Sequence, residues 1–318
     1  MIKVGIIGCE YPCAAELLRL IINHPDVELV WVVGSSAVAG TRLDSLVTGI
    51  IGECDLVADA ECNLENVDLV YLCGSRETVS SWLAEQHIPE GVHLVDLSGG
   101  HNLDHGLDKP WRYGLSEMQR RVLVHDSPWV TLPGQAAAAA LLALMPMARN
   151  LLLNSPLELR VAVDQRALSS DGHTLEGMEV DDWAQEQCRE VDFALRQCQS
   201  SFNQPMSMTV RPLVQRRTLA AEARFRCGID GDTINQLYRD YYEDHNFVFI
   251  VDRPVEVADV ENTNKCLLFL EKDEQRGELT VHAVMDALLK GSAGNAVHVM
   301  NLLFGLHERV GLALKATG

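Results

Sequence analysis

Strand-like and helix-like segments alternate through the first third of the sequence, and this alternation limits the possible fold more than any other feature. Short apolar runs rich in β-branched residues predict four strands, at 3–7, 27–33, 67–73 and 92–97. Apolar side chains at helical spacing predict helices over 14–23 and 79–86. This order favours an α/β fold with a parallel sheet wound on both faces. In such folds a dinucleotide binds at the first strand–turn–helix, where the turn here begins at Gly8.

The second half of the chain has a different pattern, with longer connections between its strands. Its predicted strands lie at 158–163, 206–210, 220–227, 247–251, 266–271 and 278–284. The last two predict an antiparallel hairpin across a turn at 273–277. Helices are predicted over 182–200, 233–242 and 296–306, and a polar loop over 164–182. The pattern indicates a second domain of the α+β class.

The stretch from Thr131 to Pro146 predicts a strand end, a tight turn and a helix. The turn is Pro133–Gly134, and five alanines and a leucine-rich segment follow soon after it. Alanine and leucine are strong helix formers, so Gln135 is expected at the N-terminus of this helix. The free N–H groups and the positive dipole end at that position favour an anion such as a thiolate. Gln135 places a neutral carboxamide there instead.

Composition excludes several classes of partner and site. The formal net charge of −19 repels nucleic-acid phosphate and anionic membranes, so neither is expected as a partner. The nine cysteines are odd in number and form no C-x-x-C pair, which indicates reduced thiols in a cytoplasmic protein. No zinc-ligand spacing is present, so no metal is expected. No apolar run of about 18 residues predicts a membrane span.

Several motifs together resemble those of one enzyme family. The matching segments are GIIG (5–8), AELLRLIINHPDVELVWVVGSS (15–36), DLS (96–98), YGLSE (113–117), NTNKCLLFLEK (262–272) and LLKGSAGNAVHVMNLLFGL (288–306). The first two resemble the opening βαβ unit of N-acetyl-gamma-glutamyl-phosphate reductase, the arginine-biosynthesis enzyme. The next two resemble its DLS and YGLPE motifs, with serine for proline in the second. The last two resemble its long C-terminal signature, and the resemblance extends over the whole chain.

The resemblance implies a Rossmann-type domain at 1–134 and 292–318. It implies a second α+β domain, of the glyceraldehyde-3-phosphate dehydrogenase C-terminal type, at 135–291. It also implies a reaction in which a cysteine thiolate attacks an acyl phosphate and phosphate leaves. NADPH then reduces the thioester to an aldehyde, and a histidine handles the proton. The implied cofactor is therefore NADP, and the implied assembly is a homo-oligomer, a dimer or tetramer.

The residues that carry this reaction in the family differ in this chain. The family's NPGCY-like motif matches residues 132–136, so Gln135 takes the place of the nucleophilic cysteine. Its carboxamide is either a helix-capping or packing group, or a hydrogen-bonding group for a ligand that is not turned over. The family's HxHxPEI-like motif matches 185–191, where Gln185 and Gln187 take the places of the histidines. His173, the nearest histidine upstream, is expected in an exposed loop.

The phosphate-binding loop of the family is altered as well. Its GxxGYxxxE pattern falls on residues 8–16, where only the first glycine, Gly8, is kept. Such loops need glycines because backbone N–H groups must approach a pyrophosphate closely. Tyr11 places a ring there, Pro12 removes an N–H donor, and Glu10 adds a negative charge. Together these changes argue against tight dinucleotide binding.

Five other positions remain candidates for cofactor contacts. Ser35 and Ser36 match a region that contacts the adenosine ribose phosphate in the family, although they also suit an ordinary turn. Gly291, Ser292 and Asn295 lie in a glycine turn that is near the nicotinamide in the family. Their retention is equally explained by the packing of the following helix.

The substrate side of the resemblance is reduced to two candidates, Ser98 of the DLS motif and Arg216. Arg216 matches an arginine segment that helps to hold substrate in the family, or it is simply a surface residue. The arginine that follows the DLS motif in the family corresponds to Asn102. A glycine-rich family segment is replaced by residues 164–172.

Three functional hypotheses follow from this pattern of changes. The first is a catalytically inactive relative with a binding, scaffold or regulatory role, whose partner is itself, a true reductase chain or another protein. The second is an active NADP-dependent reductase that uses a relocated thiol, with Cys9, Cys13, Cys73 and Cys188 as candidates. The third is a new small-molecule sensor or enzyme in the old cleft.

Overall fold

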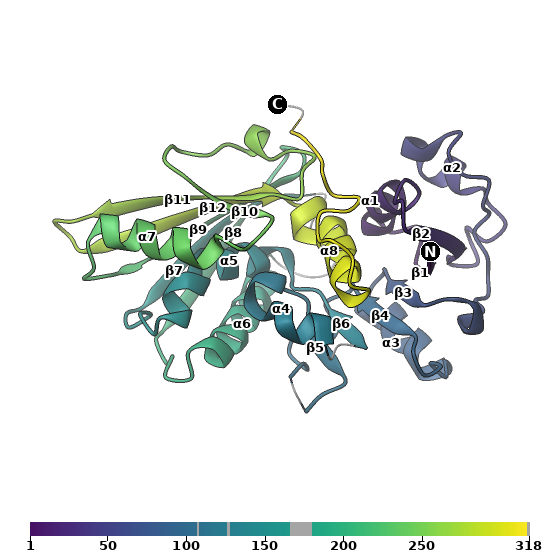
Figure 1. Ribbon diagram of the computed structural model, residues 1–318, viewed down its shortest axis with the longest axis horizontal. Helices are drawn as coiled ribbons and strands as arrows, with labels where there is room; N and C mark the ends of the chain where they lie inside the picture. The colour runs from purple at the N-terminus through teal and green to yellow at the C-terminus, as the bar shows by residue number, and fades with distance from the viewer. Residues whose placement is uncertain (107, 126–127, 166–179, 317–318) are drawn as a thin grey trace. The chain divides into compact units, whose positions relative to one another are not determined.

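The computed structural model describes residues 1–106, 108–125, 128–165 and 180–316 (Figure 1). The chain divides into two compact units. Within the described residues, the first unit comprises 1–133 and 292–313, and the second comprises 134–165, 180–291 and 314–316. His173 and most of the loop predicted at 164–182 lie outside the described residues.

The first unit is built on a six-stranded sheet in which all neighbouring strands are parallel. Its strands are β1 (Ile2–Ile7), β2 (Val27–Val33), β3 (Leu69–Leu72), β4 (His93–Asp96), β5 (Trp111–Tyr113) and β6 (Trp129–Thr131). Their order across the sheet is β2-β1-β3-β4-β6-β5. Every residue of β3 is buried, as expected for a central strand of a parallel sheet covered on both faces. The chain runs from β1 to β2 on one side and returns with β3 on the other, so the switch point of the sheet lies between β1 and β3.

The helices of the first unit come from both ends of the chain. They are α1 (Pro12–Ile21), α2 (Leu43–Leu46), α3 (Arg76–Glu85), α4 (Ser116–His125) and α8 (Gly294–Leu303), with short 3₁₀ turns η1 (Thr48–Ile50) and η2 (Leu64–Asn66). Helix α8 packs against α1, α4 and β4. The side chain of Asn301 on α8 lies 3.2 Å from the ring of His24 and donates to the backbone oxygens of Glu308 and Val310. The end of the chain is therefore an integral part of the first unit.

The second unit holds a mixed six-stranded sheet of order β10-β11-β12-β9-β7-β8. Its strands are β7 (Leu157–Asp164), β8 (Met206–Leu213), β9 (Thr218–Arg226), β10 (Val248–Val251), β11 (Cys266–Asp273) and β12 (Glu278–Asp286). Its helices are α5 (Gln135–Arg149), α6 (Val180–Cys198) and α7 (Gly231–Tyr242), with a 3₁₀ turn η3 (Val257–Asp259). A π-helical turn, η4 (Leu289–Ala293), connects β12 to α8. Strands β11 and β12 are antiparallel neighbours, which confirms the predicted hairpin.

Helix α5 is the central helix of the second unit. Its residues from Gln135 to Ala148 are all buried, as expected of a helix that is apolar on every side. Pro146 has no N–H to bond the carbonyl of Leu142, four residues earlier. The Tyr242 hydroxyl on α7 donates to that carbonyl at 2.5 Å, and a second tyrosine of α7 donates to the next carbonyl. Helix α7 therefore supplies donors where the proline disturbs the backbone bonds of α5.

The two sheets confirm the predicted fold class, a parallel α/β sheet with a second unit of mixed strands and helices. The sequence pattern did not reveal α4 or β5. Helix α4 is interrupted at Gln119, which has a φ of −148° and breaks the helical spacing. Strand β5 is only three residues long, too short for a recognisable alternation.

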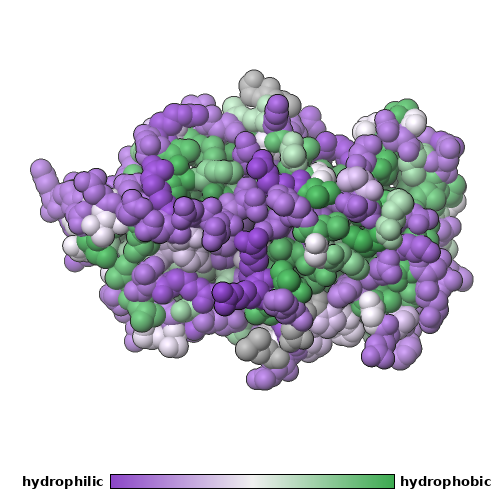
Figure 2. Space-filling model, in the orientation of Figure 1, coloured by the Kyte–Doolittle hydropathy of each residue, from purple (hydrophilic) through white to green (hydrophobic). Residues whose placement is uncertain are grey.

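Hydrophilic residues dominate the face of the molecule that Figure 2 shows, with hydrophobic patches between them. Among the described residues, no helix is both long and apolar enough to cross a membrane. The same part of the chain contains no group of three or more histidine, cysteine or acidic side chains placed to hold a metal ion.

Candidate active site

The N-terminus of α5 is the first candidate site, because the sequence places Gln135 there. Gln135 is the first residue of α5, as predicted, and its side chain is fully buried. Two residues of α6 bind the first turn of this helix. The Glu190 carboxylate accepts the Gly134 N–H at 3.0 Å, and the Gln187 carboxamide oxygen accepts the Ala137 N–H at 3.1 Å. Helix α6 therefore caps α5 from outside, and its side chains satisfy N–H groups that a helix start leaves open.

Gly134 is required by this arrangement. A Cβ atom added at Gly134 would lie 2.3 Å from Nε2 of Gln187. The structure thus brings Gln187 against the residue that precedes Gln135. Gln185, the other residue at a predicted histidine position, lies on the exposed side of α6 and does not join this cluster. Of the pair predicted from the sequence, only Gln187 faces the start of α5.

Glu190 is a member of this site to which the sequence analysis gave no role. It is buried, and it holds the backbone at the start of α5. A signal for it was available, since Glu190 matches the glutamate of the HxHxPEI-like motif that the sequence analysis placed on 185–191.

Gly291, a predicted cofactor contact, also lies beside α5 in the second unit. A Cβ atom at Gly291 would lie 3.0 Å from Leu219 and 3.6 Å from Cγ of Gln135. The lack of a Cβ atom thus allows the chain to pack closely at this point. This agrees with packing, the alternative to a cofactor contact for this turn. Ser292 and Asn295 belong to the first unit and are both buried, and Asn295 donates to the backbone oxygen of Gly114 at 2.9 Å.

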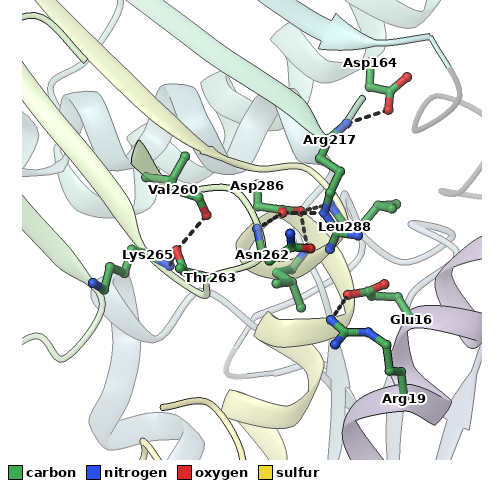
Figure 3. A network of polar contacts seen from close by, with 11 residues as sticks. Glu16, Arg19, Asp164, Arg217, Val260, Asn262, Thr263, Lys265, Asp286 and Leu288 are labelled. Carbon is green, nitrogen blue, oxygen red and sulfur yellow. Dashed lines mark hydrogen bonds and ion pairs between the residues drawn. The ribbon is translucent and has the colours of Figure 1, made fainter. Parts of the chain in front are cut away.

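A buried carboxylate, Asp286 at the end of β12, organises a second polar cluster of the same unit (Figure 3). Its Oδ2 accepts from Nε of Arg217 at 2.5 Å and from the Asn262 N–H at 2.8 Å. Its Oδ1 accepts the N–H groups of Leu288 and Leu289. Burial raises the pKa of Asp286, and the Arg217 guanidinium opposes this by favouring the ionised form. Arg217 therefore compensates a buried charge of the fold.

Arg216, the predicted substrate contact, is exposed and borders a cavity of about 320 Å³. Among the described residues, the others around this cavity are Asp164, Arg217, Glu261, Asn262 and Leu288. These described residues include two carboxylates beside the two guanidinium groups. The carboxylates lower the attraction for an anion below what the arginines alone would give.

The switch point of the first unit is the second candidate site. Gly8 follows β1 with a φ of 79°, in the left-handed region that favours glycine. Atoms of the Tyr11 ring lie 3.2 Å from a Cβ placed at Gly8 and 3.3 Å from one placed at Gly74, which follows β3. The Tyr11 hydroxyl lies 3.3 Å from the Thr78 hydroxyl. The ring thus covers both glycines at the carboxyl ends of β1 and β3.

Glu10 occupies the next part of this edge. Its carboxylate accepts the Ser35 N–H at 3.0 Å, and its second oxygen lies 3.1 Å from a Cβ placed at Gly34. Ser35 and Ser36, the predicted ribose-phosphate contacts, are both exposed. The backbone donor that an anion would use at Ser35 is thus already bonded to a carboxylate of the same chain.

The four candidate thiols are buried or half-buried, and three of them, Cys9, Cys73 and Cys188, have raised pKa values. Burial and the neighbouring Glu10 raise the pKa of Cys9 to about 11. A hydrogen bond to Cys13 and burial hold the pKa of Cys73 well above its usual range. Burial also raises the pKa of Cys188. Thiols with raised pKa values stay protonated near neutral pH, and the thiolate is the nucleophilic form.

The DLS segment forms a compact turn at the end of β4. Asp96 is fully buried, and its Oδ1 accepts the Ser98 N–H at 2.7 Å. The Ser98 hydroxyl, a predicted substrate contact, accepts the Gly100 N–H at 3.1 Å. Asn102 accepts from the Thr131 hydroxyl at 2.7 Å and so ties the turn to the end of β6. Ser98 is buried and serves the turn itself.

Comparison with known proteins assigns the family. Residues 3–125 match the model of the semialdehyde dehydrogenase NAD-binding domain, and residues 185–287 match its dimerisation domain. The chain is 35% identical to N-acetyl-gamma-glutamyl-phosphate reductases of Parabacteroides distasonis and Phocaeicola vulgatus, in each case over 99% of both chains. The chain belongs to the N-acetyl-gamma-glutamyl-phosphate reductase family. This confirms the family predicted from the motifs.

Solved structures agree on the fold of this reductase-family chain. Aspartate semialdehyde dehydrogenase II of Vibrio cholerae matches with a TM-score of 0.72 at 15% identity, over 96% of this chain and 98% of the other. The aspartate semialdehyde dehydrogenase of Candida albicans matches with a TM-score of 0.72 at 13% identity, over 95% of this chain and 98% of the other. At such identities the likeness establishes the fold alone.

The family gives the first unit an NAD(P)-binding domain, but the residues at its switch point do not fit a pyrophosphate. The ring of Tyr11 covers the two glycines where the backbone would approach the phosphates. The carboxylate of Glu10 lies at the end of the same loop and would repel them. Pro12 is the first residue of α1 and offers no N–H. The misfit comes from side chains of the loop, while the sheet around it is intact.

Proposed function

We propose that this chain is a reductase-family member that has lost the NADPH-dependent reduction of an acyl phosphate and acts as a binding or regulatory subunit. The observation that carries the proposal is the start of α5, where Gln135 and Gln187 stand at the positions of the nucleophile and the proton carrier. A carboxamide forms no thioester and has no titratable proton near neutral pH. The nucleophile and the proton carrier of the family's reaction are therefore both missing from the start of α5.

The hydrogen bonds of Gln187 support a structural role for this residue. Its oxygen accepts from the backbone of Ala137, and its side chain packs on Gly134. With Glu190 beside it, the start of α5 is bound by side chains of the same unit. In this proposal, side chains that cap the helix take the place of catalytic side chains at the start of α5, and the fold is unchanged.

The same proposal covers the cofactor. We expect no tight binding of NADP or NADPH, since Tyr11 and Glu10 occupy the loop where the pyrophosphate would bind. Catalysis by Cys9, Cys73 or Cys188 is not favoured, because their pKa values are raised, and Cys13, the fourth candidate thiol, is buried. The matched dimerisation domain supports a homo-oligomer as the working form, which size-exclusion chromatography with light scattering would test.

The decisive experiment offers the purified chain N-acetylglutamate semialdehyde, phosphate and NADP, and follows formation of NADPH. A true reductase of the family, such as that of Parabacteroides distasonis, serves as the positive control. We expect no turnover above a sample without protein. Turnover within a hundredfold of the control would overturn the proposal.

Cofactor binding is tested separately by thermal shift and by NADPH fluorescence. A ligand at a hundredfold its Kd would stabilise the fold by about 2.7 kcal/mol, so binding is readily detected. We expect no shift for the natural chain and a measurable shift for Glu10→Ala/Tyr11→Gly, in which the loop is opened. Strong stabilisation of the natural chain would show that the loop still accepts the cofactor.

Restoration of single residues tests the loss of the active site. We expect Gln135→Cys alone to remain inactive, because the proton carrier and the cofactor loop are also missing. The next variant combines Gln135→Cys with Gln187→His and with Glu10→Ala/Tyr11→Gly. It is the first variant in which we expect weak turnover. Substantial activity from Gln135→Cys alone would contradict this order.

A further inference from the structure

The cavity at Arg216 in the second unit carries charges of both signs that do not pair with each other. Arg216 and Glu261 both border this cavity, whose volume is about 320 Å³. Within the part of the chain that the structure describes, neither side chain forms a hydrogen bond or an ion pair. Arg216 is exposed, and Glu261 is half-buried. The cavity therefore offers one unpaired cation and one unpaired anion to a bound molecule.

Two residues in the left-handed backbone region lie next to these charges. Arg217 has a φ of 58° and Asn262 a φ of 61°, and each directly follows one of the two charged residues. Buried carboxylates bind both of their N–H groups. Asp164 accepts that of Arg217 at 2.7 Å, and Asp286 accepts that of Asn262 at 2.8 Å (Figure 3). Backbone of this kind costs energy and is found preferentially where ligands bind. The backbone beside both unpaired charges is thus fixed before a ligand arrives.

The charges around the cavity limit the class of ligand. Asp164 is buried and adds a second carboxylate to the lining, so a simple anion is repelled. The guanidinium of Arg217 is bound to Asp286, but that of Arg216 repels a simple cation. A molecule with one anionic and one cationic end avoids both repulsions. Ligand pockets usually measure about 300–1,000 Å³, so the volume of this cavity suits a small molecule.

We propose that this cavity binds a free α-amino acid. The guanidinium of Arg216 binds the α-carboxylate, because its paired N–H donors match the two oxygens. The α-ammonium group has three N–H donors and binds Glu261 and Asp164, since a carboxylate accepts more than one hydrogen bond. Leu288, which is half-buried, gives the side chain of the ligand an apolar contact.

The ammonium group distinguishes this ligand from that of the family's reaction. An N-acetylated amino acid, the kind of molecule on which the family's enzymes act, has an uncharged nitrogen and lacks the contact with the two carboxylates. The inference rests on the binding role in the proposed function, and it names the class of ligand.

Isothermal titration calorimetry of the full-length chain with L-alanine, L-leucine and L-glutamine tests the inference. We expect at least one of them to bind with a Kd of about 1 mM or tighter. The N-acetylated form of that amino acid lacks the ammonium group, and its amide lacks the carboxylate. Each should bind more weakly by about tenfold or more. Absence of binding by all three amino acids at up to about 10 mM would overturn the inference. Equal binding of the N-acetylated form would do the same.

Single variants show which charge binds which end of the ligand. Glu261→Gln should remove the preference for the free amino acid over its N-acetylated form. Arg216→Gln should remove the preference for the acid over its amide. Arg211→Gln, the same change at an exposed arginine of β8 that does not border this cavity, is the matched control and should leave both preferences unchanged.

Two outcomes separate a failure of this inference from a failure of the proposed function. Unchanged preferences in Glu261→Gln and Arg216→Gln, with circular dichroism confirming that both variants are folded, would place the amino acid elsewhere and overturn the inference. Turnover in the reductase assay would overturn the proposed function, and it would not alter the preferences measured by calorimetry.

Discussion

Two glycine turns, one in each unit, each lead from a strand into a helix, and side chains occupy them in different ways. At Gly134 the helix start is bound by Gln187 and Glu190, which come from a separate helix. At Gly8 the occupying side chains, Tyr11 and Glu10, come from the turn itself. Both turns bear side chains of their own unit at the place where the family resemblance puts chemistry or a cofactor.

The difference shows which parts of a site are tied to folding. At the start of α5 the backbone itself needs an acceptor for the Gly134 N–H, whether or not a reaction takes place. At the first loop the backbone needs a glycine at position 8, because its φ of 79° and a carbonyl next to it exclude a side chain. The following predictions test this difference.

The largest effect is expected for Gly8→Ala. A Cβ atom there would lie 1.9 Å from the backbone oxygen of Cys73, and φ is in the left-handed region. The obstacle is backbone in a central strand connection, which cannot move aside. We expect a loss of about 3 kcal/mol or more in the free energy of unfolding, measured by urea denaturation. A loss below about 1 kcal/mol would mean that the turn at Gly8 accommodates a side chain at least as readily as the turn at Gly134.

Gly134→Ala should cost less, about 1–3 kcal/mol, because the obstacle is the end of the Gln187 side chain. The variant should also lose the bond from Ala137 to Gln187. Combining it with Gln187→Ala should cost less than the sum of the two single changes, since the obstacle is then gone. Additive losses in this double-mutant cycle would contradict the contact.

Tyr242→Phe tests the other support of α5. The change removes the hydroxyl that donates to the Leu142 carbonyl beside Pro146, and leaves a buried acceptor unsatisfied. We expect a loss of about 1–2 kcal/mol in the free energy of unfolding. Hydrogen exchange in the second half of α5 should increase at the same time. Unchanged exchange would show that the helix does not depend on this donor.

Tyr11→Phe is the same chemical change in the other turn and should have the smallest effect. Its hydroxyl contact with Thr78 is exposed and 3.3 Å long, so a loss of about 0.5 kcal/mol or less is expected. The ring remains in place, and NADPH should therefore still fail to stabilise the chain. A gain of NADPH binding in this variant would show that the hydroxyl, and not the ring, closes the loop.

Local patterns in the sequence predicted most of the fold. The features that these patterns did not predict depend on contacts between residues that are distant in the sequence. The spacing of apolar residues predicted β2 at its observed bounds and placed Gln135 at the start of α5. It did not reveal that Gln187 would bind the backbone of Ala137, because the partners are 50 residues apart. The family motifs had assigned Gln135 and Gln187 to one site, so the approach of Gln187 to the start of α5 was expected, but its bond to the backbone was not.

The hydrogen bond between Asp96 and His101, 2.7 Å from Oδ2 to Nδ1, was not predicted, for a related reason. The DLS motif drew attention to Ser98, which the structure places inside the turn. His101 gains its character from a stacked ring on β5 and from a carboxylate five residues earlier, whose direction depends on the turn between them. A sequence gives the types of these residues but not the angle at which two side chains meet.

The return of α8 to the first unit has a consequence for the order in which the nascent chain matures. Translation delivers β1–β6 before the second unit, but the helix that packs on α1, α4 and β4 is synthesised only after it. The whole second unit is synthesised in between, and it can become compact while the first is still incomplete. His24 meets Asn301 only after the second unit has been synthesised. A chain that stops before residue 292 therefore lacks the helix that covers α1, α4 and β4, and its first unit stays incomplete.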